Sequence, residues 1–129
     1  KKLKGCQLPP ANAPKQLTQL DQLRLEWADI YAEREKGLMN RSHLGENAGM
    51  MFVFETPKTY CFWMKNTLMP LAVGFIDAQG RLVQINHMQP RSLEHHCAKQ
   101  PILYALEVNQ GWFERNNVRV QTRVLEPQK

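Results

Sequence analysis

The sequence predicts a mainly β domain, a β-rich α+β fold. We expect a compact, mostly antiparallel, barrel-like or sandwich-like sheet of about seven short strands with two short helices. Two observations carry this prediction: apolar and polar residues alternate over several short runs, and turn-forming residues, among them 8 Pro and 7 Gly, separate those runs. The short connections between successive runs favour antiparallel neighbours. A chain of 129 residues is long enough to bury one core.

The N-terminal segment differs from the rest of the chain. Residues 1–20 contain three prolines and few large apolar side chains, which predicts a flexible leader or tether followed by a single domain at 21–127. Within this segment, residues 3–6 (Leu-Lys-Gly-Cys) are similar to the end of a bacterial lipoprotein signal, in which Cys6 would carry the lipid. The alternative is that Cys6 is an exposed cysteine of the leader.

The domain begins with a strand and a helix. Leu23, Leu25 and Trp27 alternate with charged residues, as in a half-buried strand. Asp29 then stands at a helix-capping position, and residues 31–38 contain mainly good helix formers. Gly37 is a natural end for this helix.

The remaining strands are expected, in chain order, at residues 50–54, 60–64, 72–76, 81–87, 102–108 and 118–124. A turn at 55–58, with Pro57 inside it, separates the first two. The run at 72–76 is apolar throughout and predicts a strand buried on both faces. It forms the clearest hairpin with the next strand, because Gly80 can adopt positive φ in the connecting turn. A second short helix is expected at 110–116.

Four ordered sequence blocks carry a family resemblance. They are Gly-Leu-Met at 37–39 with Arg41, Gly-Met-Met-Phe-Val-Phe at 49–54, Phe-Trp-Met-Lys-Asn-Thr-Leu-Met-Pro-Leu at 62–71, and Tyr-Ala-Leu-Glu-Val at 104–108 followed by Gly111 and Trp112. Together they resemble the DUF192 family of bacteria and archaea over roughly residues 23–125.

The resemblance implies a compact β-rich domain and frequent export through a signal peptide or lipoprotein leader. It supplies no established reaction, cofactor or catalytic residue. Family members typically carry an Asp directly after the Pro-Leu pair, where this sequence has Ala72. A family site that depended on that carboxylate would therefore be in doubt here.

The turn within the third block is the main candidate for a ligand site. Lys65, Asn66 and Thr67 place an ammonium, an amide and a hydroxyl between two apolar strands, and Trp63 can stack on a ring. A structural interpretation stays open, because Asn and Thr often satisfy backbone groups in tight turns.

Two weaker candidates involve the cysteines. His95, His96 and Cys97 offer ligands that suit zinc or cuprous copper, but their spacing matches no known zinc framework. Cys97 beside His96, or Cys61 beside a distant His, would be a nucleophile only in an electropositive setting that the sequence does not indicate. We therefore expect no metal and no cofactor.

The cysteines also admit a disulfide. If the protein is exported, as the family resemblance and the leader suggest, it folds where thiols tend to pair. With Cys6 as the odd cysteine, Cys61 and Cys97 remain as the candidate bridge. The alternative is that Cys61 is a small buried apolar residue.

Glu107 is an unusual residue for its position. It lies in an apolar strand, on the face opposite Tyr104, Leu106 and Val108. A half-buried carboxylate needs a partner, so we expect an ion pair with an arginine or with Lys65.

Composition excludes more functions than it indicates. The net charge of +5 is spread along the chain without a basic stripe or a nucleic-acid-binding signature, and no apolar run is long enough for a membrane span. The favoured function is a small binding or accessory domain of the periplasm or cell envelope, with an unknown small ligand or envelope protein as its partner. One alternative is an enzyme with a site around Lys65, Asn66 and Thr67, and another is copper or zinc handling through His95, His96 and Cys97.

The kind of pocket or groove that the fold forms would discriminate between these functions. A pocket with a strongly shifted Lys or carboxylate pKa would favour an enzyme. A shallow aromatic groove over Trp63 and Trp112 without titrating groups would favour a binding domain.

Overall fold

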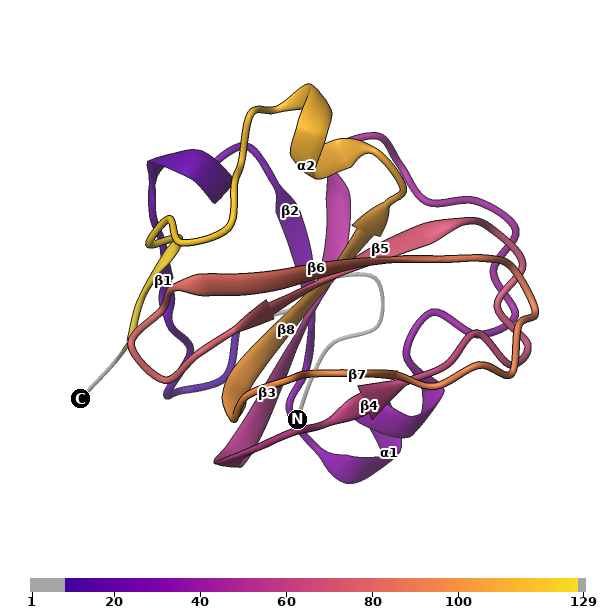
Figure 1. Cartoon of the computed structure of the whole chain (residues 1–129), viewed down its shortest axis with the longest axis horizontal. Coiled ribbons are helices and arrows are strands. Elements are labelled where there is room, and N and C mark those ends of the chain that lie inside the picture. The colour runs from indigo at the N-terminus through magenta and orange to yellow at the C-terminus, as the bar shows by residue number, and fades with distance from the viewer. Residues whose placement is uncertain (1–8, 128–129) are drawn as a thin grey trace.

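A computed structural model describes residues 9–127, so Cys6 and its predicted lipid attachment lie outside the described residues. The described chain holds nine strands, two α-helices and one 3-10 helix (Figure 1). The strands are β1 (Lys15–Gln16), β2 (Arg24–Ala28), β3 (Ala48–Lys58), β4 (Cys61–Phe62), β5 (Leu71–Ile76), β6 (Leu82–Met88), β7 (His96–Cys97), β8 (Ile102–Asn109) and β9 (Leu125–Glu126). The helices are η1 (Thr18–Leu20), α1 (Tyr31–Lys36) and α2 (Trp112–Arg115).

The main sheet has five strands in the order β2-β3-β8-β5-β6. Its strands pair antiparallel, except that β2 and β3 pair parallel. Two ribbons of two strands each, β1–β9 and β4–β7, flank it. The predicted mainly β, mostly antiparallel fold is thus confirmed, with β2 and β6 as open edges in place of a closed barrel.

Both faces of the main sheet are buried. Successive side chains on β3 accordingly enter two different cores. Met51 and Val53 belong to the core beneath α2, η1 and the C-terminal segment. Met50 and Phe52 belong to the core on the other face, which the loop after α1 and the segment around β4 and β7 cover. In Figure 1, α2 accordingly lies at the opposite end of the molecule from α1, β4 and β7.

Local sequence signals place several elements correctly. Strands β5 and β6 form the predicted hairpin, and all six residues of β5 are buried. In its turn Gly80 adopts φ 88°, and a Cβ there would lie 2.0 Å from the backbone oxygen of Leu125, so only glycine fits. Helix α1 ends at Gly37 as predicted, although Ile30 occupies the cap position expected for Asp29.

The predicted turn at 55–58 is wrong. Strand β3 continues to Lys58, which pairs with Ile102, and the register shifts between Val53 and Lys58. That irregularity accommodates Pro57, which has no N–H to donate to a regular ladder. The run at 60–64 consequently contributes only the two residues of β4.

The predicted strand at 118–124 is also wrong. Val118 and Val124 are buried, but Val120 is exposed and Gln121 adopts φ 75°, which interrupts the alternation. The segment instead follows the edge of the sheet through isolated bonds, such as the Leu82 amide donating to the Thr122 carbonyl.

The boundary between leader and domain needs correction as well. Strand β1 pairs with β9, and Leu20 is fully buried in the core. The Gln16 side-chain amide donates to the carbonyls of Leu20 and Leu23 and fixes this turn. The polar composition of residues 1–20 conceals the contacts of Leu20 and Ala13 with the core, so the fold includes residues before position 21.

We predict that Leu20→Ala lowers the free energy of unfolding by about 2–5 kcal/mol, because it removes a fully buried side chain from the core. Urea unfolding followed by circular dichroism measures this loss. Gln19→Ala, at the exposed neighbouring position, is the matched control and should change stability by less than about 0.5 kcal/mol. If the two variants were equally stable, Leu20 would not contribute to the core and would belong to the leader.

Candidate functional site

A cavity of about 380 Å³ opens between α1 with its following loop, the far half of β3 and the segment around β4. Aromatic side chains line part of the cavity, together with several charged and other polar side chains. The floor is formed by the main sheet, where β3 and β8 run side by side. Elements from three separate parts of the sequence therefore meet at this one site.

Four rings in contact form the aromatic wall. The rings of Phe52 and Phe62 meet edge to face with centroids 5.0 Å apart, and Phe54 stacks on Tyr60 at 3.6 Å. Phe62 also meets Phe54 at 6.3 Å, so the four side chains brace one another. Such contacts add to the stabilisation from burial and hold the wall in one arrangement.

Arg34 is fixed against this wall. Its guanidinium lies 5.5 Å from the centroid of the Phe54 ring, and its Nη1 donates to the backbone oxygen of Val53 over 3.1 Å. One end of the guanidinium is thus tied to β3 while the side chain lines the cavity. This arrangement places a fixed positive charge on the wall at the partly exposed side of the cavity.

Glu107 lies on the floor of the cavity. Its side chain is only 5% exposed, and its cross-strand neighbours, Met50 on β3 and Val73 on β5, are apolar. Among residues 9–127 no group hydrogen-bonds to or pairs with its carboxyl, whose oxygens are not completely enclosed, so the expected ion pair with an arginine or with Lys65 is wrong. The reason is that both flanking strands present only apolar side chains at this level of the sheet.

Burial raises the pKa of the Glu107 carboxyl from 4.5 to about 8. The group is therefore mainly protonated at neutral pH and acts as a hydrogen-bond donor. Because folding favours the protonated form, its contribution to stability is complete below about pH 4.5 and declines as the pH rises toward 8. A neutral carboxyl that opens into a cavity is available to a ligand.

Gly37 brings the backbone after α1 over this carboxyl. A Cβ at Gly37 would lie 3.3 Å from the Phe52 ring and 3.9 Å from Glu107 Oε1. Its φ of 50° with ψ of −130° is a conformation that L side chains rarely adopt. The glycine therefore both ends α1 and lets the loop close over the cavity floor.

An ion pair holds the chain near this loop. Arg41 donates to both carboxylate oxygens of Glu26 on β2, over 2.5 and 2.7 Å. Hydrogen bonding from Arg41 lowers the pKa of the Glu26 carboxyl. The Asn40 amide next to it donates to the Asn66 carbonyl over 2.7 Å, which joins the loop to the turn after β4.

The predicted ligand residues divide between the cavity and its surroundings. Trp63 and Thr67 line the cavity. Lys65 Nζ lies 5.3 Å from the centroid of the Trp63 ring. Thr67 also donates its hydroxyl to the Lys65 carbonyl, and Asn66 adopts φ 55° to form the turn. Lys65 and Asn66 are not among the residues that line the cavity.

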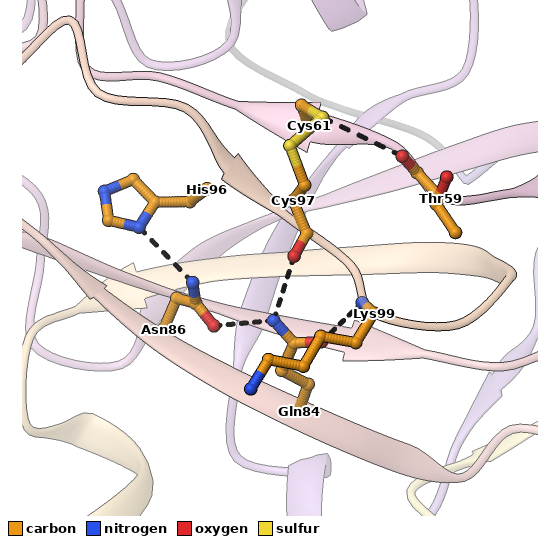
Figure 2. Close-up of a disulfide and its surroundings, with 7 residues drawn as sticks. All are labelled: Thr59, Cys61, Gln84, Asn86, His96, Cys97 and Lys99. Carbon is orange, nitrogen blue, oxygen red and sulfur yellow. Dashed lines mark hydrogen bonds between the residues drawn. A yellow bond between two sulfur atoms is a disulfide. The ribbon is translucent and has the colours of Figure 1, made fainter.

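A disulfide joins Cys61 on β4 to Cys97 on β7, where the two residues face each other across the ribbon (Figure 2). Figure 2 also shows the Gln84 side-chain amide donating to the Cys97 carbonyl, which fixes β7 to β6. In this structure neither cysteine is a free thiol for nucleophilic attack or metal binding.

The histidines beside this disulfide point to different neighbours. His95 meets the Trp63 ring edge to face at 5.7 Å, whereas His96 Nδ1 lies 3.3 Å from the Asn86 amide. Within the described chain no three His, Cys, Asp or Glu side chains gather in a way that could hold a metal ion. His95, His96 and Cys97 therefore do not converge on one point.

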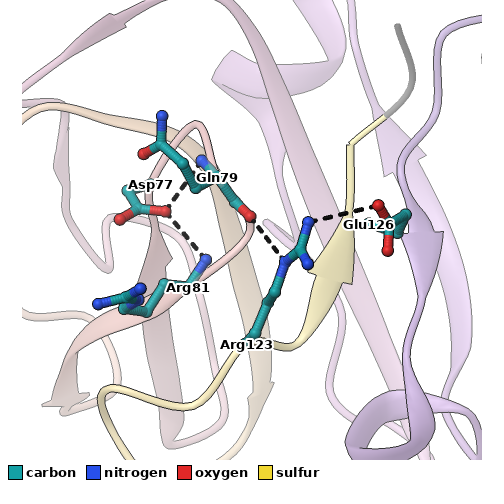
Figure 3. A network of polar contacts seen from close by, with 5 residues as sticks. All are labelled: Asp77, Gln79, Arg81, Arg123 and Glu126. Atoms are coloured by element: carbon teal, nitrogen blue, oxygen red, sulfur yellow. Dashed lines mark hydrogen bonds and ion pairs between the residues drawn. The ribbon is translucent and has the colours of Figure 1, made fainter.

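A separate polar network lies around the β5–β6 turn (Figure 3). Asp77 accepts hydrogen bonds from the amides of Gln79 and Arg81, and Arg123 donates to the Gln79 carbonyl and pairs with Glu126. These contacts secure the turn to the C-terminal strand. The network does not touch the cavity and has a structural role.

Trp63 and Trp112 share no groove in the described chain, so the feature that would favour a binding domain without titrating groups is absent there. Trp112 is fully buried in the opposite core and donates its indole N–H to Asn47. Sequence analysis also missed Arg34 and the stacked rings as site residues. Glu107 was recognised as unusual, and the signal that could have assigned it to a site is a charged residue in the middle of an otherwise apolar strand.

The fold and cavity define a small, two-core, mainly β domain with an aromatic-lined pocket, and the sequence comparisons identify its family. The DUF192 family, described as an uncharacterized ACR, matches residues 14–125, and the chain belongs to it. No protein with a curated description matches the chain. Within the described residues, no helix is long and apolar enough to cross a membrane.

Two solved structures are similar to this chain. A Sinorhizobium meliloti protein described as a "putative transcription regulator" is 35% identical, with a TM-score of 0.77, and the match covers 81% of each chain. A Novosphingobium aromaticivorans protein of unknown function is 30% identical, with a TM-score of 0.79, and the match covers 92% of this chain and 90% of that one.

Proposed function

We propose that the domain is a binding module that holds a small organic ligand in the aromatic-lined cavity. The observation that carries this proposal is the placement of a buried, unpartnered carboxyl, Glu107, at the floor of a cavity of about 380 Å³. Cavities for small ligands typically have this size, with mainly apolar walls and a few polar groups that orient the ligand.

The arrangement of polar groups fits ligand recognition. Glu107 offers a hydrogen bond at the floor, and Arg34 offers further N–H donors at the wall. Both side chains are held by packing, so little conformational freedom is lost when a ligand binds. A ligand with a flat body would use the faces and edges of the rings between these two groups.

A second candidate function is an enzyme in which Glu107 acts as a general acid. The observation in its favour is the pKa of about 8, since a carboxyl with a raised pKa in a cavity is typical of catalytic acids. A pocket with a strongly shifted carboxylate pKa favours an enzyme. Among the described residues of the cavity, however, Glu107 is the one buried titratable group. General acid catalysis usually needs a second positioned group, so we favour binding.

We further propose that the protein is exported and works in the periplasm or cell envelope. The support is the Cys61–Cys97 disulfide, because such bonds persist in oxidising compartments. The similarity of residues 3–6 to a lipoprotein signal supports the same location.

Binding is tested by screening a library of small aromatic fragments against ¹⁵N-labelled protein and mapping the amide shifts. We expect the fragments that bind to shift residues 31–39, 52–56 and 60–63, since these segments surround the cavity. Leu82, Val118 and Leu125 in the opposite core are internal controls and should not move.

Fragments that bind only outside the cavity, or a complete absence of binding, would contradict the proposed function. Chemical conversion of a bound fragment that is lost in Glu107→Gln would instead favour the enzyme. One-dimensional ¹H spectra of the same samples follow conversion, because the fragment and its product give different signals.

The compartment is tested on protein isolated from the cells of its own organism. The cysteines are alkylated without reductant, and the intact mass of the protein is measured. We expect Cys61 and Cys97 to resist the reagent until reductant is added, and the protein to separate with the envelope or periplasmic fraction. Labelled cysteines in protein from the cytoplasmic fraction would overturn the location.

A further inference from the structure

We propose that the cavity selects a planar or aromatic molecule that carries an anionic group, such as a carboxylate, at one end and a hydrogen-bond acceptor at the other. Arg34 would bind the anionic group and Glu107 the acceptor. This inference rests on the proposed binding function and names the chemical class of its ligand.

The charges that line the cavity favour an anion. They comprise three cations, Arg34, Lys36 and Lys58, and two exposed carboxylates, Glu35 and Glu55. With Glu107 protonated, the lining carries a formal net charge of +1. An ammonium ligand would gain no ionised carboxylate at the floor, and it would meet a fixed guanidinium on the wall.

Arg34 is suited to bind an anionic group. The contact with Phe54 and the bond from Nη1 to the Val53 carbonyl fix its orientation. These contacts use one N–H of the five on the guanidinium, whose planar fork matches the geometry of a carboxylate. Because Arg34 is partly exposed, this end of the ligand would lie near the mouth.

Glu107 is suited to bind a neutral acceptor. Cross-strand neighbours on β3 and β5 are apolar, and the backbone at Gly37 approaches from the loop after α1. The other titratable side chains of the lining are Tyr31 and Tyr60, beside the charged residues named above. Burial is the cause of the raised pKa of Glu107, so no charged neighbour determines the protonation state of its carboxyl. A protonated carboxyl donates to a carbonyl, an ether or a ring nitrogen.

The space between the two groups fits a flat body. The Phe52, Phe54, Tyr60 and Phe62 rings enclose it, and Trp63 lies at its rim. Aromatic side chains favour a ring in offset-stacked or edge-to-face contact. The lining of the cavity therefore combines a guanidinium donor, a carboxyl donor and several aromatic rings.

Three matched probes test the ligand class by isothermal titration calorimetry. They are 4-acetylbenzoate, its neutral amide 4-acetylbenzamide and the cation 4-acetylbenzylamine. At pH 7 we expect the carboxylate to bind at least about tenfold more tightly than the amine, because a charge-assisted bond to Arg34 replaces repulsion. Arg34→Gln should abolish this preference. Arg24→Gln, at an exposed position outside the cavity, is the control and should keep it.

The pH dependence tests the role of Glu107. Between pH 7 and pH 9 the affinity for 4-acetylbenzoate should fall about tenfold, because only the protonated carboxyl donates and most of it ionises above pH 8. In Glu107→Gln, whose amide still donates, the affinity should stay constant over this range. For 4-isopropylbenzoate, which lacks the acceptor, the fall should be smaller.

The outcomes separate the inference from the proposed function. If the amine binds as tightly as the carboxylate and shifts the amides around the cavity, the ligand class is wrong while the binding function stands. If the affinity for 4-acetylbenzoate does not depend on pH in the wild type, Glu107 does not bind the acceptor. If no probe binds, this inference fails, and the fragment screen decides the binding function separately.

Discussion

The structure depends on the position of β8 in the middle of a sheet that is buried on both faces. Strand β8 pairs with β3 on one side and β5 on the other, so its backbone cannot shift toward solvent. Its side chains must enter one core or the other. Glu107 is the carboxylic acid residue on this strand, and the pairing holds its carboxyl inside the molecule. The raised pKa follows from that constraint and needs no charged neighbour.

The elements around Glu107 keep its surroundings open without exposing it. Gly37 lets the loop after α1 approach the carboxyl without filling the space, and the Arg41–Glu26 pair holds the following residues to β2. On the other side, the irregular part of β3 carries Phe54, and the Cys61–Cys97 bond ties β4 to β7. These restraints are local and independent of one another. The cavity is therefore a preformed feature of the fold, which is the condition for orienting a ligand at low entropic cost.

Sequence predicted those parts of the structure that local chemistry decides. The β5–β6 hairpin follows from Gly80 and an apolar run, and the end of α1 follows from Gly37. The predictions failed where distant contacts decide the outcome. Val118 and Val124 alternate like a strand, but no sheet edge pairs with them regularly, and Leu20 becomes part of the core only because the C-terminal strand returns beside it. The sequence predicts Trp63 and Thr67 at a ligand site, and both line the cavity. The lack of a partner for Glu107 depends on which strands flank β8, and local sequence does not decide that.

The proposed binding role of Glu107 requires a neutral carboxyl in the unliganded domain at physiological pH. The most direct measurement is a pH titration of the Glu107 side-chain carboxyl carbon by ¹³C NMR, assigned by comparison with Glu107→Gln. We expect a midpoint near 8, while the exposed Glu35 and Glu55 serve as reference carboxyls in the same spectra. A midpoint near the ordinary value of 4.5 would show that the carboxyl is ionised and solvated, and it would contradict this description of the cavity.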